Sequence, residues 1–472
     1  MKGNLYVGLM NDSFAPQIDG VANAVMNYAE IIQKQHGRAL VAAPYYPNAS
    51  DEGYPFRIVR YQSMGLPEKI GYRVGNPLDP KALDTISREP LQILHSHCPV
   101  TALMLGRTLR ESLNIPLILT YHTKFDIDIR NAISLKLVQE AAIKALVENI
   151  ESCDEVWVVS KGAGENLRSL GYRGDYLIME NGVDVPKGRV SQTRIDDLRA
   201  ELRLSSEIPV FLFVGRLMWY KGIRIILESL KSLKESGLPF CMLFVGGGTD
   251  SEEIVKLANE LNLSDRCIFT GPVHDREKLR TFYSLADLFL FPSTFDTNGL
   301  VVREAAASGL ASVLVDGSCA AEGVSDGRNG ILIKENVESM VQALKSILLN
   351  RDKTQFLGEN AMNELYCSWE TSVAKAVARY HEIISEKRTL KFRPLHADDY
   401  FHRSLGETYA AVRTIRQYYD TAREQRDLMF EQAGEKALAL IDQVLERRES
   451  LMEQYKLRRK SARENDDLEN KK

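Results

Sequence analysis

The sequence has no uninterrupted apolar run of the roughly 18 to 20 residues that a membrane-spanning helix requires. Its first residues, MKGNLYVGLMNDSF, lack the basic region, apolar core and small-residue cleavage site of a signal peptide. We therefore expect a cytoplasmic protein, or one that lies peripherally on the inner face of the cell membrane.

The cysteines show no CxxC pair, although six are present: Cys98, Cys153, Cys241, Cys267, Cys319 and Cys367. Zinc cages and disulfide frameworks both depend on closely or regularly spaced cysteines. Neither is indicated, and most of these thiols are expected to be small buried packing groups.

An excess of positive charge is also missing, since 60 Lys and Arg residues face 64 Asp and Glu residues, for a net charge of -4. This balance argues against a dedicated nucleic-acid-binding protein. The length of 472 residues, 44% of them hydrophobic, fits an ordinary globular protein. At about 150 residues per domain, roughly two to three domains are expected.

Short apolar, β-branched runs alternate with stretches of helical periodicity, which is typical of parallel sheets with crossover helices. Two such series predict two doubly wound α/β domains, over residues 1–190 and 204–367, joined where the sequence turns polar at 186–203. A helix over 368–387 is expected to return to the first domain. The expected strands are 5–9, 39–43, 93–95, 116–120 and 155–159 in the first series, and 209–215, 241–245, 267–269, 288–291 and 312–315 in the second.

The C-terminal segment reads as a helical or coiled-coil extension over 398–460, followed by a disordered tail at 461–472. Such an apolar seam needs a partner, and we expect a homodimer, with membrane contact through the basic cluster near 455–460 as the rival. The seam consists of Leu405, Val412, Tyr419, Phe430, Ala437, Val444 and Leu451.

Parallel sheets bind ligands beyond the carboxyl ends of their strands, so residues that follow strands are the candidates for chemistry. After the first strand, Gly20 opens a helix, where free N–H groups favour an anion, although it could equally be a turn residue. In the second series, Gly215 is followed by Arg216 and Lys221 on a loop entering a helix. Two cations beside a helix N-terminus suit a diphosphate, and the glycines around Gly247 allow close approach to the backbone.

Two carboxylates stand eight positions apart near the end of the second series, Asp296 before a glycine loop and Glu304 inside the following helix. Asp296 taken singly could be a helix cap. Glu304 lies in an alanine-rich helix that should pack on the sheet, so a carboxylate there needs partners such as ribose hydroxyls.

Together, GRLMWYKG, the triple-glycine loop and DTNGLVVRE resemble the retaining nucleotide-sugar transferases of glycosyltransferase family 4. The resemblance covers roughly residues 3–385 and implies the GT-B fold, two Rossmann-like domains facing a cleft. The family usually has Glu at the position of Asp296. The pieces PQIDGVA, LHSHCP and TYHTKF (residues 120–125) further resemble the branch that glucosylates diacylglycerol.

The resemblance implies roles for individual residues. Arg216 and Lys221 would neutralise the departing nucleotide diphosphate, and Glu304 would bind the ribose. Asp296 and the backbone of Asn298, Gly299 and Leu300 would hold the sugar and its phosphate. His122 would face the donor sugar across the cleft, and the backbone at Val273 and His274 would read the base.

The expected activity is hexosyl transfer with retention, most simply of glucose from UDP-glucose, to a membrane glycerolipid such as diacylglycerol. A soluble sugar, a small molecule or a protein remains an alternative acceptor, and an inactive scaffold acting through its helical tail is a further alternative. No cofactor and no metal are expected, because cationic side chains stand where a metal ion would act. A membrane contact could lie in residues 54–72, where core packing is an equal alternative.

Overall fold

The computed structural model describes residues 5–17, 19–65, 73–132 and 135–387. The predicted helical extension over 398–460 and the tail at 461–472 lie outside these residues. Among the described helices, none combines the length and apolar character needed to cross a membrane.

The first half of the chain is built on a parallel seven-stranded sheet in the order β3-β2-β1-β6-β7-β8-β9. Most of its strands are buried along their length, which explains their continuous apolar sequence. Val7 pairs with Ala39 on one side and Ile93 on the other. The strands are β1 (Leu5–Met10), β2 (Gly37–Pro44), β3 (Arg57–Tyr61), β6 (Ile93–Ser96), β7 (Leu117–Tyr121), β8 (Glu155–Val158) and β9 (Leu177–Ile178).

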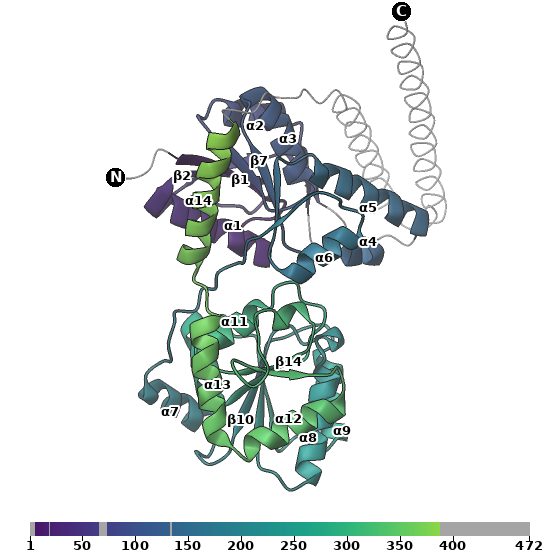
Figure 1. The fold of residues 1–472 in the computed structure, drawn as a ribbon, viewed down its shortest axis with the longest axis vertical. Helices are drawn as coiled ribbons and strands as arrows, with labels where there is room; N and C mark the ends of the chain where they lie inside the picture. Colours follow the sequence, from purple (N-terminus) through teal and green to yellow (C-terminus); the bar gives the residue numbers. More distant parts are fainter. Residues whose placement is uncertain (1–4, 18, 66–72, 133–134, 388–472) are drawn as a thin grey trace, which may run out of the picture. The chain divides into compact units, whose positions relative to one another are not determined.

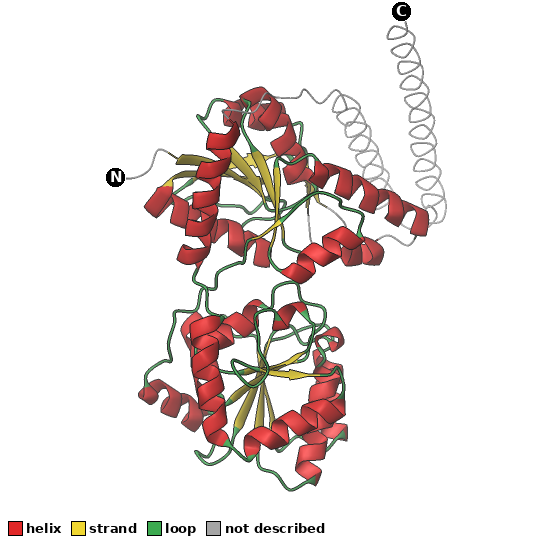
Figure 2. Cartoon of the chain, in the orientation of Figure 1, coloured by secondary structure: helices red, strands yellow, loops and turns green. Residues whose placement is uncertain are grey.

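Helices cover both faces of this sheet (Figure 2). They are α1 (Gly20–Ile31), which continues into a π-helical turn η1 (Ile32–His36), α2 (Pro80–Ser87), α3 (Thr101–Leu113), α4 (Phe125–Ala132), α5 (Lys136–Glu151) and α6 (Lys161–Ser169). A small antiparallel pair joins β4 (Ser63–Gly65) to β5 (Arg73–Gly75). Helix α14 (Trp369–Lys387) returns from the second half and packs beside α1 (Figure 1), as the sequence predicted.

The second half is built on a parallel six-stranded sheet in the order β12-β11-β10-β13-β14-β15. Its strands are β10 (Val210–Val214), β11 (Cys241–Val245), β12 (Cys267–Gly271), β13 (Leu288–Phe291), β14 (Ser312–Val315) and β15 (Ile331–Ile333). Its helices are α7 (Gln192–Glu201), η2 (Trp219–Lys221), α8 (Ile223–Glu235), α9 (Ser251–Glu260), α10 (Arg276–Leu285), α11 (Leu300–Ala307), η3 (Cys319–Ala321), α12 (Val337–Leu348) and α13 (Arg351–Glu364). Two doubly wound sheets are therefore present, as predicted.

Two regions differ from the expectation. The polar stretch at 186–203 contains helix α7, whose Ile195 and Leu198 belong to the core of the second half. In the segment at 54–72, Phe56 and Tyr61 are buried in the core of the first half, so these two side chains are unavailable to a membrane. The core-packing alternative is correct for both.

Candidate active site

The loops that follow β10 and β11 lie against each other so closely that only glycine fits. At Gly246, with φ of +140°, an added Cβ would stand 2.0 Å from the carbonyl oxygen of Gly215. The amide of Leu217 donates to the carbonyl of Gly247 at 3.0 Å, which fixes the second contact between the loops. This part of the site therefore presents backbone rather than side chains to a ligand.

Lys221 ends the short helix η2 and pairs directly with Asp296. Its ammonium lies 2.5 Å from Asp296 Oδ1, and only 10% of the lysine side chain is exposed. Ser293 Oγ donates to the other carboxylate oxygen, Oδ2, at 2.6 Å. The sequence assigned these residues to different parts of a donor, whereas the structure joins two residues 75 positions apart in one ion pair.

Arg216 follows β10 and is exposed, so its guanidinium can be reached by an anion from solvent. It lies near Tyr220, which precedes Lys221. Burial raises the pKa of Tyr220, and the positive charge of Arg216 opposes this effect. Arg216 and Lys221 thus supply two positive charges at one loop, as the sequence indicated.

Glu304 lies on α11 and its carboxylate accepts a hydrogen bond from Tyr283 Oη at 2.8 Å. Burial raises its pKa to about 7, and the Tyr283 hydrogen bond opposes that rise. The sequence did not predict Tyr283 as a partner, because the two residues lie on different helices, α10 and α11. The carboxyl group of Glu304 is therefore expected to gain or lose its proton near pH 7.

The loop between Asp296 and α11 touches the first half of the chain. Thr297 Oγ1 donates to the carbonyl oxygen of His122 at 2.8 Å, and Ser160 Oγ donates to the carbonyl oxygen of Thr297. Asn298 is buried, and Gly299, with φ of +57°, precedes Leu300 at the start of α11. Contacts from both halves thus hold the loop between Asp296 and α11.

His122 follows β7 and is 5% exposed. Its Nε2 lies 2.9 Å from His97 Nδ1, and its Nδ1 lies 3.5 Å from Asn181 Nδ2. Burial lowers its pKa to about 3, so the ring is neutral. The structure therefore places the ring nitrogens against protein groups, and the backbone carbonyl of His122 is the atom that contacts Thr297 in the loop before α11.

A third buried histidine, His95, packs on His97 with 4.1 Å between the ring centroids and the rings tilted by 36°. Its Nδ1 lies 2.6 Å from Tyr380 Oη on α14, and its Nε2 lies 2.7 Å from Thr120 Oγ1. The sequence did not predict that His95 and His97 would pack together in the core. The alternation in His95-Ser96-His97 could have indicated it, since residues two apart on a strand share a face.

The N-terminus of α1 is already occupied by a carboxylate. Asp19 Oδ1 accepts hydrogen bonds from the amides of Val21 and Ala22 at 2.9 and 2.8 Å, and Oδ2 accepts one from Ser13 Oγ. Gly20 is exposed beside it. An anion at Gly20 would have to compete with Asp19 for these donors.

The remaining predicted positions follow β12, beside the glycine loops. The amide of Gly246 donates to the carbonyl of Gly271 at 3.0 Å, which brings the start of this loop next to Gly247. Val273 is half-buried and His274 is exposed. Among the described residues, no group of three or more His, Cys, Asp or Glu side chains converges as a metal site, and metal independence stays a prediction.

Comparison with known families agrees with this arrangement. Residues 18–187 match the model for Glycosyltransferase Family 4, and residues 194–364 match the model for Glycosyl transferases group 1. Together these matches span more than two thirds of the sequence. The chain belongs to glycosyltransferase family 4.

Relatives of this glycosyltransferase include two named alpha-monoglucosyldiacylglycerol synthases. The Streptococcus pneumoniae protein is 24% identical over 64% of this chain and 69% of its own length. The Acholeplasma laidlawii protein is 24% identical over 75% of this chain and 91% of its own length. Sulfoquinovosyl transferase SQD2 of Arabidopsis thaliana is 25% identical over 74% of this chain and 67% of its own.

Solved structures share the fold of this glycosyltransferase. Anabaena HepE in complex with UDP aligns with a TM-score of 0.64 at 19% identity, covering 81% of this chain and all of that one. Sucrose-phosphate synthase from Thermosynechococcus elongatus aligns with a TM-score of 0.63 at 21% identity, covering 81% of this chain and all of its own. The GT-B fold is confirmed.

Proposed function

We propose that this glycosyltransferase moves glucose from UDP-glucose to a membrane glycerolipid such as diacylglycerol, with retention at the anomeric carbon. The observation that carries the proposal is the ion pair between buried Lys221 and half-buried Asp296 beside the exposed Arg216. Similarity to two alpha-monoglucosyldiacylglycerol synthases supports the choice of sugar and acceptor.

Donor binding would rearrange this ion pair. A diphosphate brought to the loop after β10 offers Lys221 a more highly charged partner than Asp296, which would then be released to accept from sugar hydroxyls. Glu304, held by Tyr283, would accept from the ribose hydroxyls. The structure of HepE with UDP supports a uridine nucleotide as donor.

We propose a front-face reaction. The acceptor oxygen forms a bond to the anomeric carbon on the same face from which the phosphate oxygen departs, and that phosphate oxygen takes the acceptor proton. Charge develops on the diphosphate as the bond breaks, and Arg216 and Lys221 stabilise it. Because two cations do this work, the reaction is proposed to need no metal ion.

The lipid acceptor is supported by an exposed apolar site in the first half. At the start of α5, the side chains of Leu135 and Leu137 are 52% and 74% exposed on either side of Lys136. Apolar groups beside a cation suit the interface of an anionic bilayer. Leu137→Ser should weaken flotation with anionic vesicles, whereas Leu349→Ser, at a leucine 83% exposed in the second half, should not.

The activity is tested with a panel of labelled nucleotide sugars, offered with total lipid extract or with soluble acceptors. We expect label from UDP-glucose in the lipid fraction. If label appears only in soluble products, the acceptor belongs to the alternative, soluble class. Relatives named D-inositol 3-phosphate glycosyltransferases represent that class. Absence of both hydrolysis and transfer would favour the scaffold alternative.

The predicted homodimer through residues 398–460 is tested by truncation after Lys391. The truncated chain should be monomeric and should still bind UDP-glucose. If both chains have the same oligomeric state and only the full-length chain binds vesicles, the extension is a membrane-binding segment instead.

A further inference from the structure

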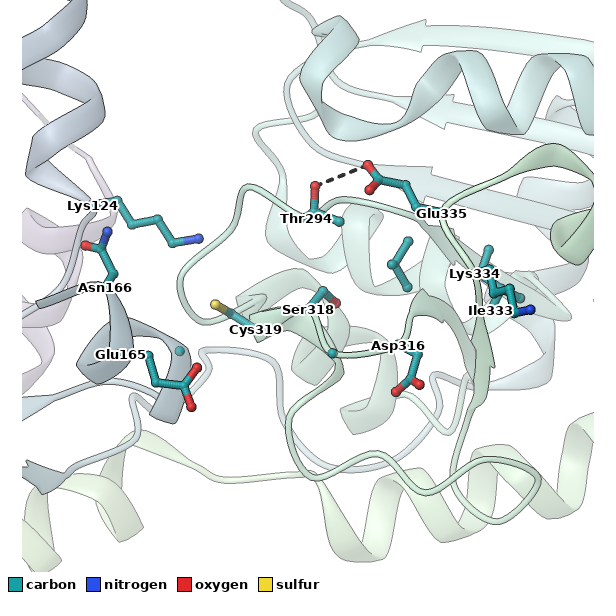
Figure 3. Close-up of a pocket in the computed structure, with 13 residues that line it drawn as sticks. Lys124, Glu165, Asn166, Thr294, Asp316, Ser318, Cys319, Ile333, Lys334 and Glu335 are labelled. Atoms are coloured by element: carbon teal, nitrogen blue, oxygen red, sulfur yellow. Dashed lines mark hydrogen bonds between the residues drawn. The ribbon is translucent and has the colours of Figure 1, made fainter. Parts of the chain in front are cut away.

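A cavity of about 620 Å³ lies where the two halves meet, apart from the glycine loops that receive the nucleotide. Lys124 and Asn166 line it from the first half, and Thr294, Asp316, Ser318 and Glu335 line it from the second. Figure 3 shows Lys124 and Asn166 on one side of the opening and Thr294 and Ser318 on the other, with the Lys124 side chain extending toward the second half.

This cavity borders the segments that carry the candidate site. Lys124 stands two residues after His122, and Thr294 stands two residues before Asp296. The hydrogen bond from Thr297 to the His122 carbonyl joins the same two segments. A ligand in the cavity would therefore contact both walls close to the reacting sugar.

One buried polar group of the cavity has no hydrogen-bond partner among the residues that the structure describes. Ser318 is 8% exposed, and its Oγ makes no hydrogen bond to any described residue. It precedes η3, yet its side chain does not cap that turn. A buried hydroxyl without a partner costs free energy, and a ligand hydroxyl would relieve this cost by donating or accepting.

The charges of the lining decide which class of ligand fits. Three carboxylates (Glu165, Asp316 and Glu335) and two ammonium groups (Lys124 and Lys334) line the cavity. An anion would face more negative than positive groups, and an acyl chain would desolvate all of them. A group rich in hydroxyls can donate to the carboxylates and accept from the ammonium groups at the same time.

We propose that this cavity binds an uncharged polyhydroxylated group, the glycosyl or polyol head of the acceptor. The proposal rests on the proposed function for the role of acceptor, and it favours an acceptor that already carries a sugar or polyol over bare diacylglycerol. The same chemistry could come from a lipid headgroup or from a free polyol, and the experiments below separate these sources.

Cys319 provides a readout that does not depend on activity. It lines the cavity, is half-buried and is a free thiol. Cys153 is also free and half-buried but lies at a different pocket, so it is an internal control. We expect saturating glucose, myo-inositol or vesicles of glucosyldiacylglycerol to slow alkylation of Cys319 at least about fivefold while Cys153 is unaffected.

Protection by the vesicles but not by free polyols would identify a lipid headgroup as the occupant. Protection by free glucose or myo-inositol would identify a soluble polyol as the occupant. Plain diacylglycerol vesicles should give no protection. Unchanged alkylation of Cys319 with every probe, or equal slowing of Cys153, would overturn the proposal. The alkylation experiment does not require sugar transfer, so its result stands even if the chain transfers no sugar. Failure of the proposed function can therefore be distinguished from failure of this proposal.

Ser318→Ala tests the unpartnered hydroxyl. It should raise the KM for the protecting acceptor about fivefold and leave the KM for UDP-glucose unchanged. The matched control is Ser308→Ala, because Ser308 Oγ is also buried without a partner among the described residues but does not line the cavity. Equal effects of the two substitutions, or none from Ser318→Ala, would contradict the assignment.

Discussion

The two halves share a doubly wound architecture but hold their polar site residues in opposite electrostatic states. In the second half, charged groups meet at the strand ends, as in the pair Lys221–Asp296. In the first half, the corresponding position holds buried histidines, and burial lowers the pKa values of His95, His97 and His122. Similar folds therefore divide the work, with charge supplied by one half and neutral hydrogen-bonding groups by the other.

This contrast has a consequence for stability at different pH values. A carboxyl group with a raised pKa lowers stability as pH rises, because the unfolded chain releases its proton first. A histidine with a lowered pKa lowers stability as pH falls, because the unfolded chain binds a proton first. The two halves should therefore respond to pH in opposite directions.

Lys221→Ala should give the largest loss of transfer, by about 10- to 150-fold, because it removes a charge-assisted contact worth roughly 1.5 to 3 kcal/mol. Steady-state kinetics with UDP-glucose and an intact thermal transition would check this. Lys278→Ala, which removes an exposed pair with Glu201, is the control. Wild-type kinetics in Lys221→Ala would contradict the assignment of the donor site to the second half.

Glu304→Gln should lower transfer by at least about tenfold, since a neutral amide is a weaker acceptor for ribose hydroxyls. It should also change the pH dependence of stability. The wild-type protein should lose stability as pH rises from about 4.5 through about 7, and the variant should lack this decline. Denaturant midpoints across this range that coincide for both proteins would show that Glu304 is not desolvated.

His97→Asn should change stability rather than chemistry, because the Asn amide can take the place of Nδ1 opposite His122. Above pH 6.5 the variant should be about 1 kcal/mol less stable. As pH falls below 6.5, the wild-type protein should lose stability more steeply than the variant. Parallel pH profiles would mean that His97 titrates normally in the folded protein.

Thr297→Val should have the smallest effect, a decrease in kcat/KM of about threefold, because it removes one neutral hydrogen bond to the His122 carbonyl. The isosteric side chain keeps the packing of the loop before α11. A decrease as large as that of Lys221→Ala would show that contact between the halves, rather than charge in the second half, dominates the reaction.

The ten predicted strands are all present, because central strands of parallel sheets are buried on both faces and give continuous apolar runs. The edge strands β3, β9 and β15 were missed, as was the small pair β4 and β5, because β3 is only partly buried and the others are two or three residues long. Helix α7 was missed because only Ile195 and Leu198 of its ten residues are buried.

The sequence singles out Lys221 and Asp296 because each lies in a segment that follows a strand, where parallel sheets bind ligands, and Glu304 because its helix is otherwise alanine-rich. Their part in donor binding stays a prediction, and their contact partners could not be predicted. The contacts from Lys221 to Asp296 and from Tyr283 to Glu304 join separate strand–helix units, and periodicity carries no information about such pairs. The occupation of the α1 N-terminus by Asp19 is local, and the Asp–Gly–Val order could have indicated a cap.

The most direct test of the account is transfer of labelled glucose from UDP-glucose to vesicles that contain diacylglycerol or glucosyldiacylglycerol, measured with and without excess EDTA. If Arg216 and Lys221 alone neutralise the leaving diphosphate, labelled glycolipid should form at the same rate in both conditions. Loss of product on chelation would show that a metal ion carries the charge that we assign to these two side chains.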